Sequence, residues 1–181
     1  HIWLDNVKRH VYGFQAFRSD NFWHNTTLFN ADDVRSLDDL LQAKWKGKIG
    51  YLDPRSGGGG SSTWAFLLKI KGEEFLRKFA AQDLVLSRDQ RQLADMLAKG
   101  KVPFTVGLSY YTFAPFLKAG LPIKPMPELK EGSYISCGSG ALTVVKNSPH
   151  PNATKVFINW LLSREGQEVY SKAMGQATRR L

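Results

Sequence analysis

The sequence predicts an α/β domain in which helices flank a mostly parallel sheet. Short β-prone runs alternate along the chain with segments whose apolar residues follow the helical period, which is the pattern of repeated strand–helix units. One strand-like run passes directly into a glycine-rich stretch and then into an apolar, helix-like run, and several predicted helices begin at capping residues. The 181 residues, 43% of them hydrophobic, are enough to bury the core of such a domain.

The first half of the chain begins with an extended, aromatic stretch over 11–29. Ser36 and Asp39 have the spacing of a capping box, which predicts a short helix. The run 48–52 predicts a strand that an Asp-Pro pair ends. Two further helical segments are expected over about 64–68 and 73–81.

The second half continues the alternation of strands and helices. Ser87 and Gln90 repeat the capping-box spacing ahead of a helix that Gly100 ends. The expected strands of this half cover 102–108, 121–125 and 141–145. The expected helices cover 110–119, start at Pro151, and start again after a Ser163 cap.

Composition and motif content exclude several classes of function. The net charge is +9, but the basic residues are scattered, so no nucleic-acid partner is expected. No run approaches the roughly 18 apolar residues of a membrane span, so no membrane insertion is expected. Cys137 is the only cysteine, which rules out an intrachain disulfide, and we expect it to be a small buried hydrophobe. Neither H-E-x-x-H nor G-x-S-x-G occurs, and no acid and base are paired at a credible spacing, so the chain is not expected to be an enzyme.

The glycine-rich stretch over 56–62 is the first candidate binding feature. It matches neither G-x-G-x-x-G nor the P-loop, which disfavours a dinucleotide or nucleoside triphosphate site. Glycines allow the backbone to approach a ligand closely, and the N–H groups of a helix start attract anions. The stretch therefore predicts an anion site, with a flexible connection capped by Ser61 or Ser62 as the alternative.

Tyr110 and Tyr111 form the second candidate feature, because they lie where a predicted strand passes into a helix. Ligands of open α/β sheets bind at the carboxyl ends of strands, so the two phenol oxygens could meet one ligand there. A helix running from Ser109 would hold Pro115 in its interior, whereas a helix starting near Ala114 would let both tyrosines converge. The alternative is that two amphipathic aromatic residues pack at the end of a strand.

Three segments resemble ferric-ion and related solute-binding proteins of ABC transporters. They are SLDDLLQAKWKGKIGYLDPRSGGG from Ser36, LADMLAKGKVPFTVGLSYY, and GSGALTVVKNSPHPNATKVFINWLLSREGQEVYSK. The resemblance covers about 22–181 in the same order. It implies a type II periplasmic-binding fold, in which crossover strands join two α/β lobes that close on a ligand.

The same resemblance implies how the chain is divided. Residues 1–30 would be a remnant of the N-terminal lobe and a crossover strand, and 31–146 would be the C-terminal ligand-binding lobe. Residues 147–181 would be C-terminal helices that return towards the N-terminal lobe, most of which the chain lacks. The full-length protein would be a periplasmic or extracellular monomer, with a lipoprotein as the alternative. It would deliver a small ligand from the interlobe cleft to an ABC transporter permease, and its export signal would lie outside this chain.

The resemblance also implies the site. Tyr110 and Tyr111 stand where two adjacent tyrosines of the ferric proteins bind Fe(III), a hard cation suited to phenolate oxygen. The residues implied for a companion anion are Ser56, Gly57, Gly58, Ser61, Ser62 and Gln90. Two alternatives stay open. The ligand could be an organic anion such as a phosphonate or sugar phosphate, with charge from Arg55, Arg88 or Arg91, or the fold could serve as a sensory or regulatory domain.

Overall fold

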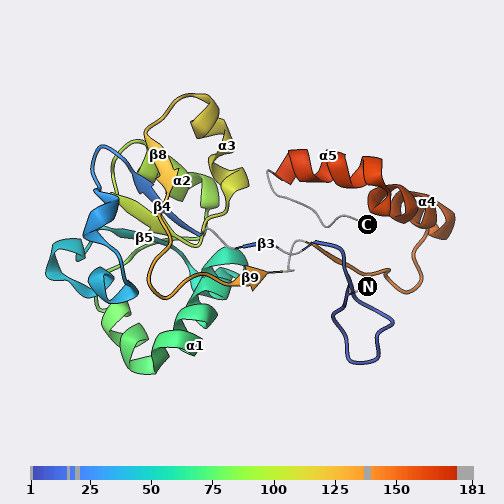
Figure 1. Cartoon of the computed structure of the whole chain (residues 1–181), viewed down its shortest axis with the longest axis horizontal. Helices are drawn as coiled ribbons and strands as arrows, with labels where there is room; N and C mark the ends of the chain where they lie inside the picture. The colour runs from blue at the N-terminus through green and yellow to red at the C-terminus, as the bar shows by residue number, and fades with distance from the viewer. Residues whose placement is uncertain (1, 16, 19–20, 137–139, 175–181) are drawn as a thin grey trace. The chain divides into compact units, whose positions relative to one another are not determined.

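The computed structural model describes residues 2–15, 17–18, 21–136 and 140–174, and they form two compact units (Figure 1). Unit 1 consists of 1–19 and 135–181, and unit 2 of 20–134. The boundaries expected from the sequence, after residues 30 and 146, differ from these. Residues 22–25 pair into the sheet of unit 2, whereas 135–136 and 141–142 pair with 17–18 and 12–13 of unit 1. Cys137 lies outside the described residues.

Unit 2 contains a five-stranded mixed sheet with the strand order β6-β5-β7-β4-β8. Its strands are β4 (Phe22–Asn25), β5 (Ile49–Leu52), β6 (Val85–Ser87), β7 (Phe104–Val106) and β8 (Ile123–Pro125). The expected α/β class is confirmed, but the sheet is mixed rather than mostly parallel. β5 runs parallel to β6 and β7, whereas β4 pairs antiparallel with both β7 and β8.

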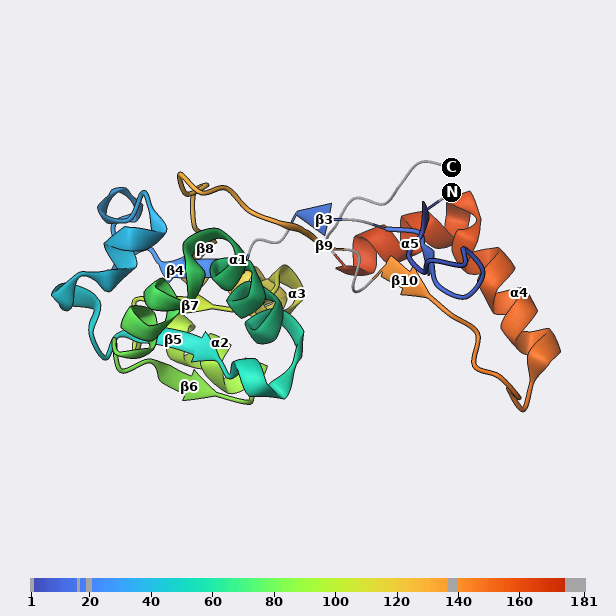
Figure 2. The same cartoon turned by 90° about the horizontal axis from the view of Figure 1, so that it is seen from below.

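Helices cover both faces of this sheet (Figures 1 and 2). They are α1 (Gly58–Ala80), α2 (Gln90–Ala98) and α3 (Tyr110–Lys118). Side chains of α1 pack in one apolar cluster with Ile49 and Tyr51 of β5, whereas α2 and α3 pack in another with Leu52 and Trp23. Because successive strand residues point to opposite faces, β5 contributes side chains to the apolar cluster on each face of the sheet. Four 3₁₀ turns complete the unit: Ala31–Asp33, Leu37–Leu41, Ala43–Trp45 and Pro54–Ser56.

The helix boundaries confirm some sequence predictions and correct others. Gly72 has φ 80° and ψ 177°, so α1 is interrupted between the two predicted helical segments. The capping box of Ser36 and Asp39 is present, although the helix that it opens is a 3₁₀ helix. The capping box predicted from Ser87 is wrong. Asp89 caps α2, while the Ser87 hydroxyl lies within hydrogen-bond distance of the Asp89 carbonyl, at 3.0 Å, and of Gln92 Oε1, at 2.8 Å.

The first turn of α1 lies directly against the ends of two strands. A Cβ atom on Gly60 would stand 2.1 Å from the carbonyl oxygen of Leu52, and one on Gly59 would stand 2.2 Å from that of Gly107. Only glycine permits this approach, because real Cβ contacts do not fall below about 3.0 Å. The predicted glycine loop is therefore mostly helix, and Gly59 and Gly60 allow this helix to pack closely against the strand ends. Gly107, at φ 95°, completes the contact from the other side.

Unit 1 is smaller, and its described residues form short strands and two helices. Its strands are β1 (Ile2–Trp3), β2 (Tyr12–Gly13) and β10 (Ala141–Leu142), which form one antiparallel sheet, and β3 (Phe17–Arg18) with β9 (Ile135–Ser136), which form another. Its helices are α4 (Pro151–Leu162) and α5 (Arg164–Met174). The predicted Ser163 cap is confirmed, because its hydroxyl accepts the Gly166 N–H. On α4, Val156 and Phe157 are 70% and 54% exposed. Among the described residues, no helix is both long and apolar enough to cross a membrane.

Replacing Gly60 by alanine tests the packing at the start of α1. The added methyl group would meet the Leu52 backbone, which cannot move without distorting β5. We expect the free energy of unfolding to fall by about 2 kcal/mol or more, measured by urea denaturation. Ser62→Ala, at an exposed position of the same turn, should change it by less than about 0.5 kcal/mol. Equal effects of the two substitutions would contradict the packing explanation.

His24 predicts how the stability of unit 2 depends on pH. Its side chain is 6% exposed, and burial, together with the Lys124 charge, lowers the pKa of the imidazole. The unfolded chain therefore binds the proton more readily, so stability is full above the unfolded pKa and is lost as the pH falls below it. We expect the loss attributable to His24 to approach at most about 1.4 kcal/mol per pH unit below roughly pH 6.5. His24→Phe should flatten this slope in urea denaturation between about pH 7 and pH 5, and an unchanged slope would contradict the assignment to His24.

Candidate functional site

Three helices of unit 2 begin at the edge where the parallel strands end. β5, β6 and β7 end at Leu52, Ser87 and Val106, and α1, α2 and α3 begin a few residues after each of them. Helix N-termini carry partial positive charge and unpaired backbone N–H groups, so this edge favours anions. The sheet topology thus brings the predicted glycine stretch, Gln90 and the tyrosine pair to one edge.

The three helix starts differ in how they are capped. The Asp89 carboxylate accepts the N–H groups of Arg91 and Gln92, at 2.8 and 3.2 Å, and so occupies the start of α2. Gly57 and Ser109, the residues before α1 and α3, contribute no side-chain cap. These two uncapped starts are neighbours, because Gly59 packs on the Gly107 carbonyl. Of the three helix starts at this edge, those of α1 and α3 therefore have backbone N–H groups without a side-chain cap.

The residues predicted for the anion site sit around the start of α1. Ser56 ends the 3₁₀ turn and is exposed, Gly57 has φ 80°, and Gly58 is the first residue of α1. The hydroxyls of Ser61 and Ser62 each donate to the Gly58 carbonyl at 3.0 Å. The donors that this turn offers to an anion are consequently backbone N–H groups, because the Ser61 and Ser62 hydroxyls already donate to Gly58.

The two tyrosines occupy the first two positions of α3. Pro115 lies inside the helix, so the alternative in which α3 begins near Ala114 and lets both tyrosines converge is wrong. As neighbours on a helix, the two side chains leave the helix axis about 100° apart. Tyr110 and Tyr111 are 42% and 46% exposed. Their neighbours differ: the Tyr110 ring lies 6.3 Å from that of Trp23, whereas the Tyr111 hydroxyl donates to Gln90 Oε1 at 3.3 Å.

Gln90 links the starts of α2 and α3. Its side-chain oxygen accepts hydrogen bonds from Tyr111 and, at 3.1 Å, from the Thr112 hydroxyl. It makes no capping box with Ser87, so the capping interpretation of Gln90 is wrong, and its side chain instead contacts Tyr111 and Thr112. A cavity of about 900 Å³ lies beside this contact and is lined by Arg88, Asp89, Gln90, Arg91, Tyr111, Thr112, Pro115 and Phe116.

Asp53 forms ion pairs with two arginines at this edge, although the sequence indicated only that it ends a strand. Its side chain is 3% exposed and accepts hydrogen bonds from Arg55 Nε at 2.9 Å and Arg88 Nε at 3.1 Å. The Arg55 side chain, its backbone N–H and Arg88 hold the pKa of the Asp53 carboxyl well below its usual range. Two guanidinium groups therefore stand beside one permanent carboxylate, with N–H groups to spare for an anion.

The arrangement offers phenol oxygens, backbone N–H groups and guanidinium groups as binding chemistry. In the described part of the chain, no three His, Cys, Asp or Glu side chains gather closely enough to hold a metal ion. The phenol oxygens of the two tyrosines are hard ligands that this edge can offer to a cation.

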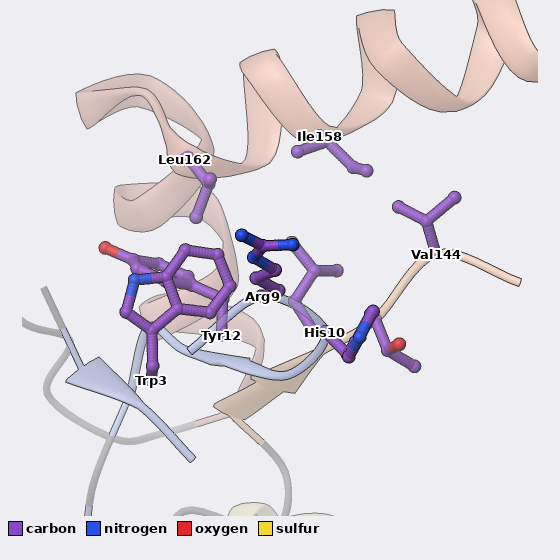
Figure 3. Close-up of a pocket in the computed structure, with 9 residues that line it drawn as sticks. Trp3, Arg9, His10, Tyr12, Val144, Ile158 and Leu162 are labelled. Atoms are coloured by element: carbon purple, nitrogen blue, oxygen red, sulfur yellow. The ribbon is translucent and has the colours of Figure 1, made fainter. Parts of the chain in front are cut away.

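A second cavity, of about 520 Å³, lies in unit 1 (Figure 3). The rings of Trp3 and Tyr12, whose centroids are 5.4 Å apart, form one side, and Ile158 and Leu162 of α4 lie above them. Arg9 and His10 also line it, and their backbone N–H groups are held by the Asp5 carboxylate at 3.0 and 3.1 Å. None of the predicted site residues lies there.

The sequence resembles curated and solved binding proteins. It is 26% identical over 163 residues to the Fe(3+)-binding periplasmic protein of Serratia marcescens, a match that covers 85% of this chain and 47% of the relative. The chain therefore spans about half the length of that relative.

Two solved structures share the fold. A two-component system protein that mediates signal transduction matches with a TM-score of 0.79 and 20% identity, over 98% of this chain and 59% of the other. The periplasmic binding protein AfuA of Actinobacillus pleuropneumoniae, with fructose-6-phosphate bound, matches with a TM-score of 0.72 and 23% identity, over 92% and 53%. The family model for bacterial extracellular solute-binding proteins matches residues 14–168, across both units. The chain belongs to the bacterial extracellular solute-binding protein family, a family of binding proteins.

Proposed function

We propose that this chain is part of the solute-binding component of an ABC importer that captures ferric iron together with a companion anion. The observation that carries the proposal is the meeting of two uncapped helix starts, those of α1 and α3, with the tyrosine pair on the first turn of α3. In this proposal Tyr110 and Tyr111 bind Fe(III) as phenolates. The companion anion binds the backbone N–H groups after Ser56, at Gly57 and Gly58.

Charge balance supports the pairing of a cation with an anion. Two phenolates neutralise only part of the charge of Fe(III), so an anion beside the metal completes the neutralisation, and the helix dipoles of α1 and α3 stabilise that anion. The similarity to an Fe(3+)-binding periplasmic protein supports the same choice. The protein would work in the periplasm or outside the cell, and would deliver the ligand from an interlobe cleft to a membrane permease.

A second candidate is an organic anion such as a sugar phosphate or phosphonate. The cavity beside Tyr111 favours it, because Arg88 and Arg91 line that cavity next to the apolar surface of Pro115 and Phe116. Guanidinium groups bind phosphate and carboxylate through paired hydrogen bonds, and the apolar wall suits a carbon skeleton.

Removing the two phenol oxygens tests the iron proposal. We expect ferric nitrilotriacetate with bicarbonate to give the wild-type chain a visible tyrosinate-to-iron absorption band. Tyr110→Phe with Tyr111→Phe should abolish the band and weaken Fe(III) binding by about 100-fold or more, since both anionic ligands are lost. Binding should also weaken as the pH falls from about 8 to about 6, because Fe(III) must displace the phenol protons of its ligands.

Tyr12→Phe, which alters a tyrosine of unit 1, is the control and should leave the band and the affinity unchanged. A wild-type chain that stays colourless and metal-free with added iron would overturn the iron proposal and favour the organic anion.

Neutralising the arginines tests the second candidate. We expect Arg88→Gln and Arg91→Gln each to weaken binding of fructose 6-phosphate by about tenfold, measured by isothermal titration calorimetry, because each removes a charge-assisted hydrogen bond. Arg77→Gln, an exposed change on α1 where the guanidinium pairs with Glu73, is the matched control. Binding that is unaffected by the first two changes, or affected equally by all three, would count against this candidate.

A further inference from the structure

We infer that Asn21 is a positioning residue that sets the two uncapped helix starts, of α1 and α3, against each other for anion binding. The inference rests on the proposed function, because it concerns the anion at the start of α1. Asn21 lies immediately before β4, and its side chain is 4% exposed. None of the sequence motifs pointed to it.

The backbone of Asn21 holds the approach to α3. Its carbonyl oxygen accepts the N–H of Gly107 at 2.8 Å. Gly107 follows β7 with φ 95°, and the chain reaches the start of α3 at Tyr110 shortly afterwards. The position of the tyrosine pair therefore depends on where this turn is held.

The side chain of Asn21 holds α1. Its Nδ2 atom has two protons, and the structure uses both: one bond goes to Thr63 Oγ1 at 2.9 Å and one to the Tyr134 hydroxyl at 2.7 Å. Thr63 lies in the second turn of α1 and is fully buried. The Thr63 and Tyr134 hydroxyls are also 3.4 Å apart, so the three groups form one network.

The first turn of α1 lies against the same side chain. A Cβ on Gly59 would stand 3.6 Å from Asn21 Nδ2 and 2.2 Å from the Gly107 carbonyl oxygen. Asn21 thus contacts the start of α1 through its side-chain amide, and it holds the turn before α3 through its backbone carbonyl. Buried hydrogen-bond networks keep a geometry fixed because leaving a member unpaired is costly. Fixed donors bind a ligand more tightly, since they lose less freedom on binding.

β4 supplies a matched control for Asn21. Asn25, at the other end of the strand, is 2% exposed and donates from Nδ2 to the Leu97 carbonyl at 2.9 Å. Asn25 is therefore the same residue type with similar burial at the opposite end of β4, but its side chain bonds α2 and Thr27 and not the two uncapped helix starts. Asn25→Ala separates a loss of stability from a loss of positioning.

Asn21→Asp separates geometry from charge. A carboxylate can accept hydrogen bonds from the Thr63 and Tyr134 hydroxyls and so retain the network. It also brings a negative charge to the first turn of α1, where it would repel an incoming anion. We expect this variant to be more stable than Asn21→Ala and yet to bind anions no better.

The test follows the backbone amides of residues 57–60 by NMR while inorganic phosphate is added to the full chain. We expect Asn21→Ala to weaken phosphate binding by about tenfold and Asn25→Ala by less than about twofold, at similar losses in urea midpoint. Asn21→Asp should bind phosphate at least as weakly as Asn21→Ala. Unchanged binding in Asn21→Ala, or equal weakening in Asn25→Ala, would overturn the inference.

Failure of the proposed function gives a different result. If phosphate shifts no amide of 57–60 even in the wild-type chain, the anion site itself is wrong. The positioning role is then decided by amide hydrogen exchange over residues 59–64. Faster exchange in Asn21→Ala than in Asn25→Ala would support the positioning role, and equal exchange rates would contradict it.

Discussion

The contact between the first turn of α1 and the ends of β5 and β7 is the constraint on which the rest of the structure depends. Gly60 and Gly59 bring the helix backbone so close to the carbonyls of Leu52 and Gly107 that no side chain fits between them. This approach fixes where α1 starts, and because Gly107 leads into α3, it also fixes where the tyrosine pair stands. The packing of the fold and the geometry of the candidate site are therefore one arrangement.

This arrangement gives the candidate site its chemistry. Of the three helix starts at the sheet edge, α2 is closed by its own Asp89, while α1 and α3 keep backbone N–H groups without a side-chain cap. Asp53 holds Arg55 and Arg88 at the same edge, and their charges outweigh its own. The phenols of α3 stand next to this positive region, which suits a ligand that combines a hard cation with an anion.

Much of the fold could be predicted from local signals. The Ser36 capping box, the helix start at Pro151 and the Ser163 cap all depend on residues within one turn of each other. The antiparallel insertion of β4 could not be predicted, because it depends on pairing with strands about eighty to one hundred residues later. The sequence predicted a binding loop at these glycines and did not reveal their packing role. That role depends on close approach to the carbonyls of Leu52 and Gly107, and Gly107 is distant in sequence. Asn21 carried no motif, since its partners at 63, 107 and 134 are distant in sequence.

The most direct test of this account is where Fe(III) sits on the chain. Paramagnetic Fe(III), added as ferric nitrilotriacetate, broadens the NMR signals of nearby amides. The account predicts that broadening will centre on the starts of α1 and α3, around 57–60 and 109–112. Broadening centred on the cavity of Trp3 and Tyr12, or none above that of a diamagnetic Ga(III) control, would contradict it.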